Sequence, residues 1–86
     1  MLSDNPTMDE IMEAKCEDVT PLWERTKQEL AAWPVGDPSD PHEIVRDQFR
    51  LHEIAVEQRC GWTECEKTAR RKRRIIEWLF VTGRLA

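Results

Sequence analysis

Six basic side chains lie within eight consecutive positions, from Lys67 to Arg74, in a chain of 86 residues with a net charge of −4. Guanidinium and ammonium groups bind phosphates, pair with the carboxylates of a partner, or balance acidic residues of their own chain. On a helix, four of these basic groups fall on one side, followed there by a tryptophan and a valine. This set, the arginine row, consists of Lys67, Arg70, Arg71, Arg74, Trp78 and Val81.

The arginine row is predicted to be exposed. Trp78 is then not needed in the core and is available to a partner, because tryptophan and arginine are the residue types that carry binding energy at interfaces. Ile54 stands alone on the polar face of the preceding helix and predicts a further contact point. The predicted core face of the last helix lies almost opposite the row and comprises Cys65, Ala69, Ile76, Leu79 and Phe80.

Three interpretations of the arginine row remain open from the sequence. A basic stripe that ends in an indole suits phosphate contacts with base stacking, although a pI of about 5.2 is unusual for a dedicated nucleic-acid binder. The same groups suit a protein partner. The row can also be explained without any partner. It is then a solvated face with the ion pairs Glu66–Arg70 and Arg73–Glu77, or it pairs with acidic residues of the first two helices.

The cysteine and histidine residues are the candidate metal ligands of this chain. The C-x4-C spacing of Cys60 and Cys65 differs from the C-x2-C of most structural zinc sites. His52 precedes Cys60 by two helical turns, roughly 12 Å at 1.5 Å per residue. We therefore predict free thiols, with no metal and no cofactor.

His52 lies in the middle of an apolar helix face. It is predicted to be a core histidine whose ring bonds to Gln48, one turn earlier, or to a backbone carbonyl. The alternative is a pH-sensitive or catalytic imidazole. The chain has no glycine-rich phosphate loop and no serine in a nucleophile turn, so we predict a protein without enzymatic activity.

The apolar residues recur with a helical period and β signals are few, which predicts an all-α bundle of about four helices. Residues 7–33 are predicted to form two short acidic helices, the second beginning at Thr20 and Pro21. Residues 34–40 form a Pro/Gly loop. Residues 41–86 form an antiparallel hairpin of two long helices, with a cap at Asp40, a capping box of Thr63 and Glu66, and a stop at Gly83.

Length and charge indicate one small domain, residues 1–86. Residues 1–48 carry twelve acidic and four basic side chains, whereas residues 49–86 carry five acidic and nine basic ones. Such halves attract each other or the opposite halves of a second copy.

The N-terminus lacks the features of a signal peptide and no apolar run is long enough to span a membrane, so we expect a cytoplasmic protein with no membrane partner.

These observations predict a small interaction or regulatory protein, such as an adaptor, an inhibitor or an assembly subunit. It is expected to bind another protein, or itself as a homo-oligomer, through the arginine row. The alternative is a regulator that binds DNA or another nucleic acid, using the same row for phosphate contacts.

Overall fold

A computed structural model describes residue 2 and residues 5–85; Met1, Ser3, Asp4 and Ala86, which belong to the predicted 1–86 domain, lie outside the described residues. The described part contains four helices and no strand, which confirms the predicted all-α bundle. The helices are α1 (Met8–Glu13), α2 (Cys16–Ala32), α3 (Pro41–Glu57) and α4 (Glu64–Val81).

The predicted caps and stop signals of α3 and α4 are mostly present in the structure. Asp40 accepts a hydrogen bond from the backbone N–H of His42 at 2.9 Å and so caps α3, and the bond from the His42 ring lowers the pKa of this carboxyl group. Thr63 accepts from the N–H of Glu66 at 3.1 Å, but Glu66 bonds to the Thr63 hydroxyl instead of its N–H, so the predicted capping box is only half formed. Gly83 ends α4 with φ +71°.

The predicted boundary between the first two helices is wrong. The chain breaks at Ala14 and Lys15, where the backbone is extended, and α2 continues through Pro21. Proline cannot donate to the carbonyl of Glu17, which is why the sequence favours a helix start there. The earlier break brings both Ile11 and Val19 into the core, at 0% and 1% exposure, and this burial offsets the missing hydrogen bond.

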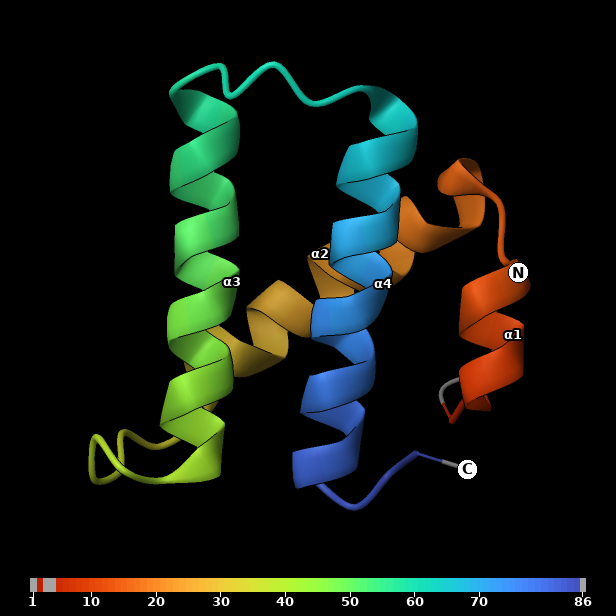
Figure 1. The fold of residues 1–86 in the computed structure, drawn as a ribbon. Helices are drawn as coiled ribbons and strands as arrows, with labels where there is room; N and C mark the ends of the chain where they lie inside the picture. The colour runs from red at the N-terminus through yellow and green to blue at the C-terminus, as the bar shows by residue number, and fades with distance from the viewer. Residues whose placement is uncertain (1, 3–4, 86) are drawn as a thin grey trace.

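The last helix is the centre of the bundle. Figure 1 shows α3 and α4 side by side in opposite directions, with α2 crossing behind both and α1 beside α4 on the side away from α3. α4 packs against each of the other three helices. The predicted hairpin is therefore confirmed, and α2 covers one of its faces. No helix of the described chain covers the opposite face, which is turned toward the viewer in Figure 1.

The buried side of α4 differs from the predicted one. Leu79 is buried as expected, but Cys65 and Ala69 are exposed, Ile76 is half-buried and Phe80 is 72% exposed. The buried side chains of α4 are instead Thr68, Ile75, Trp78 and Leu79. The reason is tertiary: because α2 crosses behind the hairpin, the side of α4 that must be apolar is the one centred on Ile75.

The core is built around two tryptophans. Trp23 and Trp78 are both fully buried, and Trp23 stacks on Phe49 with ring centres 4.4 Å apart. No helix in the described part of the chain has the length and apolar character needed to cross a membrane.

Candidate binding crevice between α3 and α4

The structure places Trp78 in the core, so the prediction that it is an exposed contact residue is wrong. Its exposure is 0%, its Nε1 donates to Oε1 of Glu29 at 3.3 Å, and its ring meets the edge of Trp33 at 5.2 Å. Val81 is half-buried against the same core. The cause is the rotation of α4 described above, which turns this end of the arginine row toward α2.

The basic members of the row also do not form one exposed stripe. Arg70 is exposed, whereas Lys67, Arg71 and Arg74 are half-buried. Lys67 pairs with Glu64 at 3.2 Å and Arg74 with Glu77 at 3.3 Å, both at i,i+3 spacing and not at the predicted i,i+4.

The third interpretation offered ion pairs between the row and acidic residues of the first two helices, and the two remaining arginines of the row make none. Within the described residues, neither Arg70 nor Arg71 has a carboxylate within ion-pair distance.

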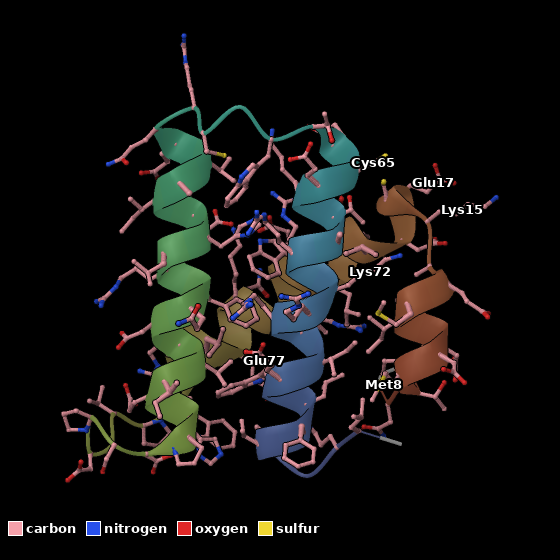
Figure 2. The ribbon with its side chains drawn as sticks, viewed as in Figure 1. Met8, Lys15, Glu17, Cys65, Lys72 and Glu77 are labelled. Atoms are coloured by element: carbon pink, nitrogen blue, oxygen red, sulfur yellow. The ribbon has the colours of Figure 1, made fainter. Side chains whose placement is uncertain are left out.

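A small crevice of about 170 Å³ separates α3 from α4 and receives two of the arginines. Leu51 and Arg70, which line it, are exposed. Figure 2 shows Glu77 on the side of α4 that faces α3, one turn beyond the crevice. The crevice is lined by Gln48, Leu51 and His52 of α3, Trp62 of the connecting loop, and Arg70 and Arg74 of α4.

Aromatic rings fix the geometry of this crevice. The guanidinium of Arg70 lies 4.1 Å from the centre of the Trp62 ring, a cation–π distance. The His52 ring lies between Trp62, at 5.5 Å, and Trp23, at 4.9 Å. Trp23 is held in turn by Glu53, whose Oε1 accepts from the indole N–H at 2.9 Å. Through His52, the wall of the crevice therefore contacts the core and α2.

Arg71 lies behind the crevice. Its guanidinium is 5.5 Å from the centre of the Trp23 ring, and its Nε is buried without a hydrogen-bond partner. Arg74 faces α3, where Nη1 donates to Oε1 of Gln48 at 3.1 Å. Three guanidinium groups are thus held near one imidazole.

His52 is buried, at 5% exposure, as the sequence predicted. The predicted bond to Gln48 is wrong, because the oxygen of Gln48 accepts from Arg74 instead. Among the described residues, Nε2 of His52 has no hydrogen-bond partner. Burial lowers the pKa of His52, the charge of Arg71 lowers it further, and Arg70 and Arg74 act in the same direction, whereas Glu53 raises it. The ring is therefore neutral at neutral pH.

The groups that line the crevice are suited to holding an anion. Its described lining offers guanidinium, imidazole, amide and indole groups, and it contains no carboxylate, thiol or hydroxyl. Sequence reasoning named Arg70, Arg74 and His52 but missed Leu51 as a site residue. It was detectable in principle, because Leu51 follows Gln48 by three positions and so shares a side of α3 with it.

The other candidate residues lie elsewhere. Ile54 is 38% exposed, as predicted, but it does not line the crevice. All three cysteines are exposed, and the described residues contain no cluster of three potential metal ligands. A larger hollow of about 600 Å³ lies at the junction of α1, α2 and α4, on the side of α4 where Figure 2 shows Cys65 and Lys72. Lys72 closes part of it by donating to the backbone carbonyl of Met12 at 2.8 Å.

Comparison of this chain with models of protein families, with curated proteins and with solved structures found no match.

Proposed function

We propose that this protein is a small non-enzymatic binding protein, an adaptor, inhibitor or assembly subunit, that holds an acidic segment of another protein. The observation that carries the proposal is the face of the α3–α4 hairpin opposite α2, which no described helix covers. Apolar side chains and arginines occur together there: two apolar residues lie seven positions apart on α3, and three arginines lie at i, i+3 and i+4 on α4, with a phenylalanine seven positions after the second arginine. This hairpin face comprises Ile44 and Leu51 of α3 and Arg70, Arg73, Arg74 and Phe80 of α4.

The composition of the hairpin face supports a protein partner. Ile44, Leu51 and Phe80 are 51%, 55% and 72% exposed, and large apolar side chains left together on a surface mark interaction sites. Arginine is enriched among the residues that dominate binding energy. The partner segment is proposed to be acidic because Arg70 has no carboxylate within 4 Å among the described residues, and complementary charge sets specificity and association rate.

A nucleic-acid partner has weaker support. Lys67 and Arg74 each have a carboxylate within 3.3 Å, and these carboxylates repel phosphate groups. The chain as a whole carries a net charge of −4. Phosphate contacts by the exposed arginines are therefore treated as one outcome of the test below.

The proposal is tested by site-specific photo-crosslinking in cells. p-Benzoylphenylalanine is placed at position 51, on the hairpin face, and at position 35, where Val35 is 83% exposed but lies in the 34–40 loop. Mass spectrometry then identifies the crosslinked peptides. We expect position 51 to capture acidic segments of one protein, and position 35 to capture none of them. The crosslink should be lost in Arg70→Glu and retained in Arg50→Glu, which carries the same charge change on an exposed side chain of α3.

Three results contradict the proposal. Equal capture at positions 51 and 35 means that the hairpin face is not a binding surface. Capture of a second copy of this chain identifies a homo-oligomer instead of a separate partner. Capture of nucleic acid, together with binding to a labelled DNA duplex that falls steeply with salt, identifies the alternative function.

A further inference from the structure

The crevice between α3 and α4 combines positive charge with an unpartnered buried group. Arg70 has no ion pair within the described chain, and Arg74 pairs with Glu77, whose side chain is 36% exposed. His52, which also lines the crevice, is 95% buried, and within the described residues its Nε2 has no hydrogen-bond partner. A buried polar nitrogen without a partner is uncommon in native structures and calls for a ligand or a bound water.

We propose that this crevice is a carboxylate-binding site, in which Arg70, Arg74 and Nε2 of His52 hold the side-chain carboxylate of an Asp or Glu residue. The source of the carboxylate rests on the proposed function: it is the anchor residue of the acidic partner segment. A carboxylate oxygen accepts hydrogen bonds from both guanidinium groups and from the Nε2–H tautomer of the neutral imidazole.

The size of the crevice favours one small group. Its volume of about 170 Å³ is below the roughly 300–1,000 Å³ typical of pockets for whole drug-sized ligands. It therefore fits a terminal group that enters from the hairpin face while the remainder of the ligand stays outside. Leu51, at 55% exposure, provides an apolar contact for the methylene carbons next to that group.

The charge around the crevice favours a carboxylate over a phosphate. Glu77 lies 3.3 Å from Arg74, so a dianionic phosphate faces a negative charge beside the arginine that would bind it. A carboxylate carries a single charge and matches the planar fork of a guanidinium. Of the charges near His52, only Glu53 is negative, and it is engaged with Trp23 and Lys27.

NMR titration of the intact chain with sodium acetate tests this site, with sodium chloride at the same ionic strength as the reference. We expect a saturable shift of the His52 Nε2 resonance and a rise in the pKa of His52, because a bound anion favours the imidazolium. Arg70→Gln and Arg74→Gln should each weaken acetate about tenfold, the usual effect of losing a charge-assisted hydrogen bond. Arg50→Gln is the matched control: it removes one charge from an exposed side chain of α3 that belongs neither to the crevice nor to the hairpin face, and acetate affinity should stay within about twofold.

Three outcomes overturn the inference. The first is a shift that is linear in acetate or equal in chloride. The second is an equal loss of affinity in Arg50→Gln, which indicates general charge attraction. The third is tighter binding of inorganic phosphate than of acetate at pH 7, which assigns the site to phosphate.

The crosslinking experiment separates this inference from the proposed function. If acetate does not bind but the crosslink at position 51 still depends on Arg70, the hairpin face binds a partner without this carboxylate anchor. If acetate binds as expected but the two crosslink positions behave alike, the carboxylate site stands and the partner-binding function is wrong.

Discussion

Replacing Trp78 by alanine is expected to lower the free energy of unfolding by about 3–5 kcal/mol, the usual range for deleting a large aromatic side chain from a core. The ring is 0% exposed. Burying a tryptophan side chain removes about 150–250 Å² of accessible surface from water, which corresponds to about 4–6 kcal/mol at 25 cal/mol per Å². An alanine at this position keeps a small part of that buried surface. The total stability of a domain of this size is only about 4–13 kcal/mol. The substitution therefore removes a large share of it.

Thermal and urea unfolding followed by circular dichroism measure this effect. Since 1 kcal/mol shifts the Tm of a domain of 60–100 residues by about 4–8 °C, Trp78→Ala should lower the Tm by at least about 12 °C. Phe80→Ala is the control on the same helix: its ring is 72% exposed, so the substitution should cost at most about 1 kcal/mol.

The reverse result refutes the assignment of the core. If Trp78→Ala costs less than about 1 kcal/mol and Phe80→Ala costs more, then α4 is rotated as its apolar pattern alone predicted, with Trp78 on the surface.

Three further predictions concern single positions. Because the folded-state pKa of His52 is lowered, its contribution to stability is fully present above the unfolded pKa of about 6.5 and is lost as the pH falls through the folded pKa. The urea concentration at the unfolding midpoint should therefore decrease when the pH is lowered from 7.5 to 5, and an increase contradicts the assignment. Thr63→Ala removes the cap of α4 and should cost about 1 kcal/mol by urea unfolding, whereas Thr20→Ala, whose hydroxyl bonds only to the preceding turn, should cost less than about 0.5 kcal/mol; equal costs show that the cap contributes nothing. Gly83→Ala should cost about 1–2 kcal/mol, because φ at this position is +71°, a conformation that is unfavourable for alanine. No described atom lies within 4 Å of the added Cβ, so this cost comes from the backbone alone, and an unchanged Tm indicates a different backbone there.

The helix ends and the hairpin were predictable because they depend on residues close in sequence. Asp40, Thr63 and Gly83 act on the backbone within a few positions, and the short connection between α3 and α4 allows only an antiparallel arrangement. The break at residues 14–15 carries no such local signal. It follows from the requirement that Ile11 and Val19 reach one core.

The rotation of α4 about its axis was not predictable from the helix alone. Ile76 and Phe80 define one apolar side and Ile75 and Trp78 define another, and both are consistent with a helical period. Three neighbouring helices decide between them, and the sequence does not give the direction in which α2 crosses. The same applies to the crevice, where Arg70 reaches Trp62 only because of the conformation of the connecting loop, with φ +56° at Arg59 and +82° at Gly61.

The central position of α4 has a consequence for synthesis of the protein. α1, α2 and α3 each pack against α4, which follows all three in the chain. At about 5–20 residues per second, the first three helices leave the ribosome seconds before their shared partner does. Until then Trp23 and Phe49 have no complete core to enter, and the nascent chain exposes them to chaperones and proteases. Folding of this bundle is therefore delayed until α4 emerges, because the other three helices share it as a partner.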